Sequence, residues 1–107
     1  MKGCEDATKK LYEEGREECL KKAMEIVCTD RESQYGAPED NFAKIADFWS
    51  DYLGYHVTTE DVPMMMALLK IARAATGKFK ADNYIDLAGY AACGMEIAER
   101  NTVGESK

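Results

Sequence analysis

Two pairs of charged residues lie inside the most apolar stretches of this 107-residue sequence. Lys70 and Arg73 have i, i+3 spacing, so they share one face of a helix. Asp82 and Asp86 have i, i+4 spacing and share a face in the same way. Because an isolated buried charge is costly, we expect the cationic face to pack against the acidic face.

These side-chain types can also do chemistry. Two carboxylates one helical turn apart can hold Mg²⁺, which prefers oxygen ligands. Lys70 and Arg73 can bind phosphate oxygens, and the arginine can hold two oxygens at once. The alternative interpretation is a structural ion-pair network that fixes the register of two helices. The residue types alone leave both interpretations open.

A second group of candidates follows Pro38, whose missing N–H suits the first position of a helix. Glu39 and Asp40 place negative charge where a bare helix N-terminus would attract an anion, so a phosphate nearby would need a metal ion. The alternative is that both carboxylates only complement the helix dipole. Asn41 is a candidate for binding a ligand or for holding the preceding loop.

Aromatic residues could stack a base, although most aromatics at helical spacing belong to a core or an interface. The candidates are Tyr35, Trp49, Tyr84 and Tyr90. Of these we place Tyr35, before the second predicted helix, and Tyr90, one turn after Asp86, in a ligand site.

The elements that must position these residues are helices. Apolar residues recur with helical spacing, while proline and glycine mark the boundaries, and no strand-like alternation appears. The expected helices span residues 17–29, 38–53, 60–76 and 82–100. Thr58 and Thr59 can cap the third helix. The sequence therefore predicts an all-α fold, a compact antiparallel bundle of about four helices, with a charged N-terminal arm at 1–16, a single domain at 17–100 and a frayed tail at 101–107.

The third and fourth helices are unusually apolar. Lys70 and Arg73 are the only charges between Val62 and Thr76, whereas a surface helix ordinarily carries a charged face. A chain of this length has few residues with which to cover two such helices. We therefore expect a homo-oligomer, a dimer or higher, with these helices near the interface.

The net charge and the lengths of the apolar runs exclude some classes of binding partner. The net charge of −6 argues against general affinity for polymeric nucleic acid or an anionic membrane, while leaving room for a single phosphate ligand. The longest apolar run, 62–69, is far shorter than the ~20 residues of a membrane span. Four cysteines lack the close spacing of zinc ligands, and we expect Cys19, Cys28 and Cys93 to be small core residues. With no apolar signal region at the N-terminus, a cytoplasmic location is expected.

Four separated blocks carry a resemblance, which covers about residues 20–98. They are DRESQYGAPEDNF at 30–42, WSDYLG at 49–54, LLKIAR at 68–73 and DNYIDLAGY at 82–90. In this order they resemble a small family of phage and prophage proteins, which implies the cytoplasm of a bacterial host cell. More distantly, the Lys-x-x-Arg and Asp-x-x-x-Asp-x-x-Gly-Tyr blocks resemble nucleotide-modification-associated domains of phages and the MazG-like all-α nucleoside triphosphate pyrophosphohydrolases.

The distant resemblance implies a Mg²⁺-dependent enzyme that cuts between the α- and β-phosphates with an activated water. On this reading Glu39 and Asp40 are catalytic, and Asp82 and Asp86 bind the metal. The ligand would be held by Lys70, Arg73, Asn41, Tyr35 and Tyr90. The Glu-Glu-x-x-Glu block of those enzymes is absent from the second helix, and Asp82-x-x-x-Asp86 replaces their Glu-x-x-Asp.

Three functions therefore stay open. The first is a Mg²⁺-dependent nucleotide pyrophosphohydrolase. The second is a non-catalytic protein that sequesters a nucleotide immune signal and so counters host defence. The third is a structural or protein-binding helical module.

Overall fold

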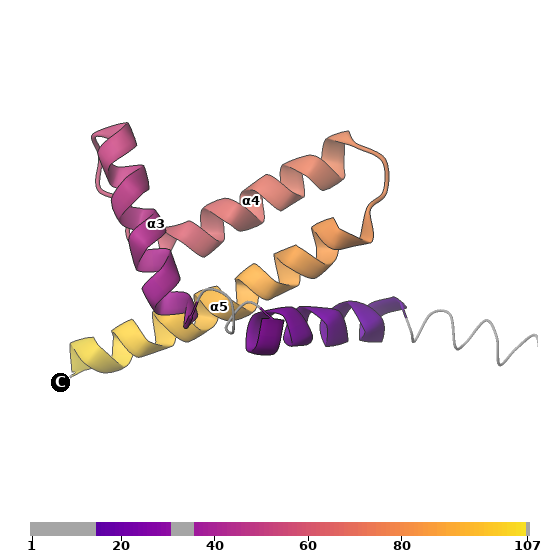
Figure 1. The fold of residues 1–107 in the computed structure, drawn as a ribbon, viewed down its shortest axis with the longest axis horizontal. Helices are drawn as coiled ribbons and strands as arrows, with labels where there is room; N and C mark the ends of the chain where they lie inside the picture. The colour runs from indigo at the N-terminus through magenta and orange to yellow at the C-terminus, as the bar shows by residue number, and fades with distance from the viewer. Residues whose placement is uncertain (1–14, 31–35, 107) are drawn as a thin grey trace, which may run out of the picture.

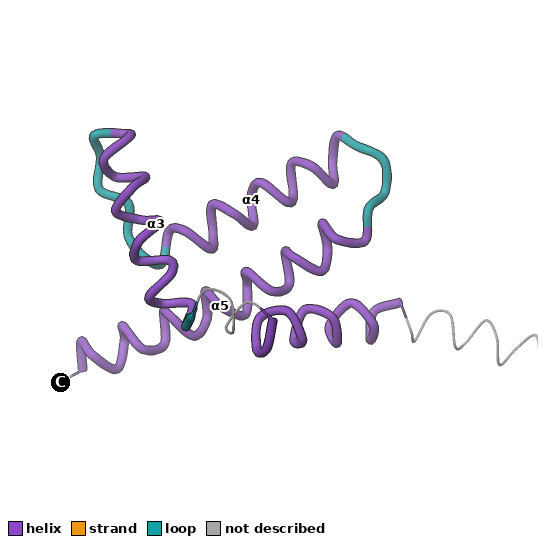
Figure 2. Tube along the Cα trace, in the orientation of Figure 1, coloured by secondary structure: helices purple, strands orange, loops and turns teal. Residues whose placement is uncertain are grey.

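The structure, a computed structural model, describes residues 15–30 and 36–106. These residues form four helices and their connecting turns, with no strand in the described ranges (Figure 2). Residues 15–25 are α-helical and continue into a π-helical turn, η1 (Ile26–Asp30). The later helices are α3 (Pro38–Leu53), α4 (Asp61–Thr76) and α5 (Ala81–Ser106). The all-α prediction is confirmed, whereas residues 1–14 of the expected arm, and Tyr35, lie outside the described residues.

The two most apolar helices, α4 and α5, form an antiparallel hairpin and share the most extensive contact between elements (Figure 1). The loop at residues 77–80 joins them. In Figure 1, α3 lies across this hairpin and contacts both helices, and the N-terminal helix lies along α5, which η1 contacts. The expected antiparallel pairing of the third and fourth predicted helices is therefore confirmed.

The connection from α3 to α4 is held by one serine. Gly54 ends α3 in the left-handed region, at φ 65°, and its N–H donates to the Ser50 carbonyl at 2.9 Å. The Ser50 hydroxyl donates to the Ala46 carbonyl at 2.7 Å and accepts from the Val57 N–H at 2.8 Å. Val57 is buried, so its backbone N–H needs an acceptor within the protein, and the Ser50 hydroxyl supplies it.

A reciprocal pair of hydrogen bonds precedes α4. The Asp61 N–H donates to Thr58 Oγ1 at 3.1 Å, and the Thr58 N–H donates to Asp61 Oδ2 at 2.9 Å. This is the pattern of a capping box, which satisfies two N–H groups at a helix start. The predicted capping role of Thr58 is confirmed.

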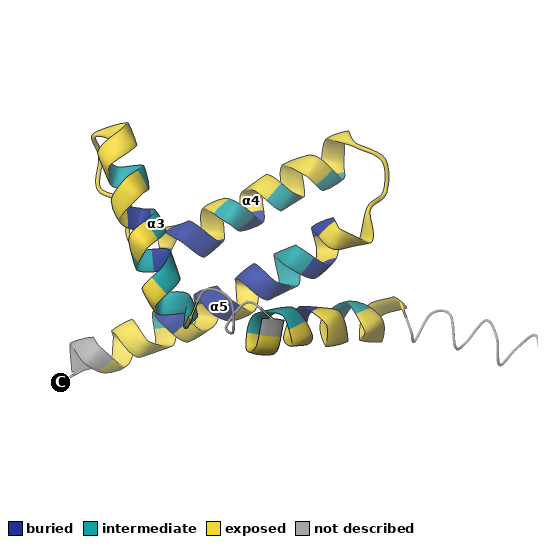
Figure 3. Cartoon of the chain, in the orientation of Figure 1, coloured by how far each residue is buried: buried dark blue, intermediate teal, exposed yellow. Residues whose placement is uncertain are grey.

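The core lies where α3 crosses the hairpin (Figure 3). Its buried members are Phe42, Ala46, Val57, Val62, Ala67, Tyr90, Cys93 and Ile97. Two glycines of α5 let neighbouring chain segments come close. A Cβ at Gly94 would lie 3.0 Å from the Met64 side chain, and one at Gly89 would lie 3.0 Å from Val27.

Two local expectations differ from the structure. α5 continues to Ser106, beyond the end near Arg100 that the pattern predicted, and Asn101 donates from Nδ2 to Glu60 Oε1 at 2.7 Å. The prediction that Cys28 is a core residue is wrong, because it lies exposed on η1. Cys93 is buried as predicted, since it faces the crossing of α3 and α5.

Candidate functional site

The predicted contact between the cationic and acidic faces exists between Lys70 and Asp86. Lys70 Nζ lies 2.8 Å from Asp86 Oδ2, and these side chains are 13% and 26% exposed. Lys70 comes from the middle of α4 and Asp86 from the second turn of α5. The ion pair therefore fixes the register of the hairpin near its connecting loop.

A hollow of about 420 Å³ opens beside this ion pair, and we call it the basic hollow. It is lined by Lys70, Arg73, Thr76, Gly77, Lys78, Lys80, Asp82, Asn83 and Asp86. Four cationic side chains face two carboxylates there, so the lining is net positive in a chain of net charge −6. The structure thus brings together four of the predicted site residues, from both helices of the hairpin.

Five of the nine lining residues were missed in the sequence, and three of them, Lys78, Lys80 and Asn83, carry polar or charged groups that could contact a ligand. Lys78 and Lys80 belong to the loop between α4 and α5, where lysines are ordinarily solvated. Asn83 lies in the first turn of α5 and is buried, which is uncommon for a polar side chain. Both lysines lie within ten residues of Arg73 and of the acidic pair in the sequence, which is a signal that could have identified them. Only the geometry of the hairpin shows that they line the same hollow.

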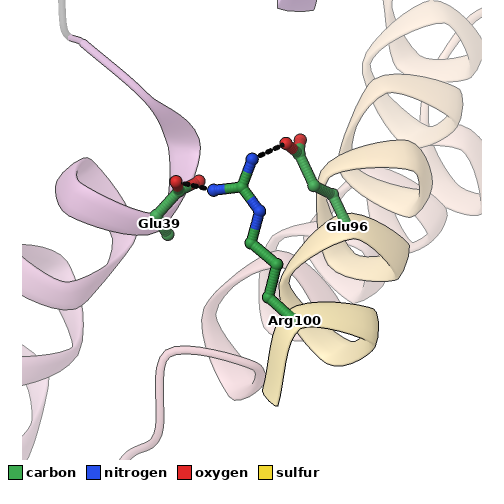
Figure 4. A network of polar contacts seen from close by, with 3 residues as sticks. All are labelled: Glu39, Glu96 and Arg100. Atoms are coloured by element: carbon green, nitrogen blue, oxygen red, sulfur yellow. Dashed lines mark hydrogen bonds and ion pairs between the residues drawn. The ribbon is translucent and has the colours of Figure 1, made fainter. Parts of the chain in front are cut away.

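Glu39 lies in a different place, at the crossing of α3 with the second half of α5. Figure 4 shows Arg100 between two carboxylates, with Glu39 on one side and Glu96 on the other. Arg100 Nη2 lies 2.7 Å from Glu96 Oε1, and Nη1 contacts Glu39 Oε1. The Arg100 side chain is 56% exposed, so this network resembles a surface ion pair of modest stabilising effect.

The two carboxylate sites are far apart along α5. Arg100 lies 14 residues after Asp86, which corresponds to about 21 Å of helix at 1.5 Å per residue. Magnesium ligands lie about 2 Å from the ion. Glu39 therefore cannot share one metal ion with Asp82 and Asp86 in this conformation.

The remaining candidates divide between surface and core. Asp40 is exposed and Asn41 is half-buried in the first turn of α3. Tyr90 is buried and packs against Phe42, with ring centroids 6.4 Å apart. Neither Asp40, Asn41 nor Tyr90 lines the basic hollow.

The metal role of Asp82 and Asp86 stays a prediction. Across residues 15–30 and 36–106, no three His, Cys, Asp or Glu side chains gather where they could hold a metal ion. Asp86 is already neutralised by Lys70. The residues at the basic hollow fit an anion better than they fit a resident Mg²⁺ ion.

An aromatic pair lies beside the same loop, with Phe79 in the loop and Tyr84 in the first turn of α5. The Phe79 and Tyr84 rings are stacked, with centroids 6.1 Å apart and planes 29° apart, and Phe79 is 81% exposed. Both rings line a second hollow of about 690 Å³, the aromatic hollow, which lies between the N-terminal helix and the start of α5. Lys78 and Lys80 line the basic hollow, while Phe79 and Ala81 line the aromatic one. The loop therefore separates a cationic surface from an aromatic surface.

In the part of the chain that the structure describes, no helix is both long enough and apolar enough to cross a membrane.

The chain has relatives in phages. The "Gene 55 protein" of Mycobacterium phage D29 is 36% identical over 91 residues, which are 85% of this chain and 60% of that protein. The "Gene 55 protein" of Mycobacterium phage L5 is 42% identical over 73 residues, which are 67% of this chain and 47% of that protein. The matches thus span only about half of each relative's own length. No solved structure matches significantly.

The family model described as "Domain of unknown function (DUF6378)" matches residues 18–98, which include all four blocks of the resemblance to phage and prophage proteins. The more distant resemblance to MazG-like enzymes stays a prediction. The chain belongs to the phage-associated DUF6378 family.

Proposed function

We propose that this domain binds a nucleotide or a nucleotide-derived small molecule, with its phosphates in the basic hollow, and does not hydrolyse it. The observation that carries this proposal is the set of four cationic side chains around one hollow, in a chain that is otherwise acidic.

Lys70 has a different role from the other three cations. Its partner Asp86 holds it at 2.8 Å, so its ammonium is pre-positioned at the edge of the hollow. Arg73, Lys78 and Lys80 form no ion pair with any carboxylate among the described residues. These three are therefore available to a ligand, and an arginine can bind two phosphate oxygens in a fixed geometry.

The aromatic pair favours a nucleotide over an inorganic anion. A base can stack on an exposed aromatic face, with a contribution of about 1–3 kcal/mol per base. Phe79 lies between the two loop lysines in the sequence, so a base on the aromatic pair and phosphates in the basic hollow would lie on the two surfaces of one loop.

The positions of the carboxylates support binding without hydrolysis. A pyrophosphohydrolase needs carboxylates that hold Mg²⁺ and activate a water near the phosphates. Here Asp86 is paired with Lys70, and Glu39 lies beside Arg100 at the other end of α5. A phage protein that binds a nucleotide without turnover would lower its free concentration in the host cytoplasm. Sequestration of a nucleotide signal is therefore the biological role that we propose.

Titration calorimetry with ATP, tripolyphosphate and adenosine, each with Mg²⁺ and with a chelator, tests this function. We expect ATP to bind in both conditions, tripolyphosphate to bind more weakly, adenosine to bind weakest, and no pyrophosphate to be released. Pyrophosphate release that requires Mg²⁺ would favour the enzyme instead. Absence of binding by all phosphate compounds would leave the ion pair as a purely structural feature.

A further inference from the structure

The side of α4 that is turned away from α5 is apolar and exposed. Figure 3 shows much of this side in the colour of exposed residues. Four large side chains lie on it, between 38% and 63% exposed: Met65, Leu68, Leu69 and Ile71. Ala72 and Ala75 are exposed between them. We call these six residues the outer face of α4.

The outer face contains no charge. Between Val62 and Thr76 the only charged residues are Lys70 and Arg73, and both line the basic hollow on the side of α5. A helix that is covered on one side only ordinarily carries its charges on the other side. In α4 both charges lie on the side of α5, and large apolar residues also cover the side that is turned outward.

We propose that the outer face of α4 is the interface with a second copy of this chain, related to the first by a two-fold axis. Four side chains of this size at these exposures supply somewhat under half of the ~800 Å² that each partner buries in a standard interface. The two alanines and the flanks of the helix add to it.

Self-complementarity favours a second copy as the occupant. Two chains of net charge −6 repel each other over most of their surfaces, and the outer face is where they can meet without bringing like charges together. A two-fold interface places the same patch on both sides, which an uncharged apolar patch satisfies without a complementary partner. Met65, at its start, can adapt its packing.

Leu68 is the position at which a substitution tests this interface most directly. It lies at the middle of the 16 residues of α4, so two copies that cross at their midpoints bring Leu68 against its own counterpart. The basic hollow stays open in such a dimer, because Lys70 and Arg73 lie on the other side of the helix. Dimerisation and ligand binding are therefore separable.

Sedimentation velocity from low to high micromolar protein tests the interface, using Leu68→Asp with Leu20→Asp as its control. Leu20 lies on the N-terminal helix and is 64% exposed, against 63% for Leu68, so both variants place the same charge at an equally exposed position. Wild type and Leu20→Asp are expected at twice the chain mass. Leu68→Asp raises the dimer dissociation constant by roughly 100-fold or more, because two carboxylates then face each other across the interface.

Leu68→Ala and Leu68→Lys complete the design. Alanine is the best helix former, so Leu68→Ala keeps the helix and raises the dissociation constant by roughly tenfold through lost contact alone. Mixing Leu68→Asp with Leu68→Lys restores a dimer if the two positions face each other. Helical circular dichroism of each variant verifies that it is folded.

Three results would overturn the proposal. The first is a wild-type protein that stays monomeric at every concentration, as it would if another segment or protein covers α4. The second is equal behaviour of the Leu68→Asp and Leu20→Asp variants. The third is a mixture of Leu68→Asp and Leu68→Lys that stays monomeric.

Discussion

Lys70 Nζ lies 2.8 Å from Asp86 Oδ2 and joins the middle of α4 to the second turn of α5. The contact holds one cation at the edge of the basic hollow and removes one carboxylate from any metal site. Its two side chains are mostly buried, so each needs the other. The Lys70–Asp86 pair can therefore stabilise the hairpin and also present a cation to a ligand.

Removal of one member of this pair should destabilise the domain. We expect Asp86→Asn to lower the free energy of unfolding by about 1–3 kcal/mol, because it leaves a largely buried ammonium without its counter-charge. Urea unfolding followed by circular dichroism measures the loss. Replacing both Lys70 and Asp86 with apolar residues should cost less than the two single changes added together. Additive losses would show that the two residues do not interact.

The turn between α3 and α4 should depend on Ser50. Ser50→Ala removes the acceptor of the buried Val57 N–H and is expected to lower the unfolding free energy by about 1–3 kcal/mol. Thr76→Ala is the control, because the Thr76 hydroxyl also donates to a carbonyl four residues earlier but is exposed. That change should stay within about 0.5 kcal/mol. Equal losses in the two variants would contradict the role given to Ser50.

Close approach of α4 to α5 should make Gly94 intolerant of larger side chains. In Gly94→Val the added atoms meet Met64 and Pro63, and we expect a loss of about 1–3 kcal/mol in the free energy of unfolding. The same change at Gly15, where a Cβ meets nothing within 4 Å, should be close to neutral. Thermal or urea unfolding of both variants measures the change in stability. A Gly94→Val protein as stable as wild type would show that α4 and α5 can move apart at this point without loss of unfolding free energy.

Removal of the Phe79 ring should weaken the binding of a ligand that has a base and leave the binding of a bare phosphate chain unchanged. Phe79→Ala is expected to weaken ATP binding by roughly 5- to 150-fold, because a stacked base contributes about 1–3 kcal/mol. Tripolyphosphate affinity should not change. Tyr52→Ala is the control, since Tyr52 is 89% exposed but lies on α3, away from the loop. Equal weakening of ATP and tripolyphosphate would show that Phe79 supports the loop and does not contact a base.

The parts of this structure that sequence could predict are local ones. Pro38 begins α3 and Gly54 ends it, because ring geometry and a positive φ act within a single residue. The Lys70–Asp86 contact was predictable because a buried charge requires a partner and the hairpin connection is short.

The rest depends on how helices cross. Glu39 meets Arg100, 61 residues later, only because of where α3 lies across α5, and no spacing in the sequence encodes that position. The apolar character of α4 predicted a helix covered on all sides, whereas in a single chain its outer face is exposed. Lys78 and Lys80 were missed for a similar reason, since they become site residues only when the loop folds beside Arg73.

Calorimetric titration of ATP into Arg73→Ala and Arg100→Ala tests the central claim most directly. Both changes remove one exposed arginine, but Arg73 lines the basic hollow and Arg100 lies at the other end of α5. We expect Arg73→Ala to weaken binding by roughly tenfold or more, because it removes a charge-assisted contact to phosphate, and Arg100→Ala to bind as wild type. Normal ATP affinity in a folded Arg73→Ala protein would contradict the account.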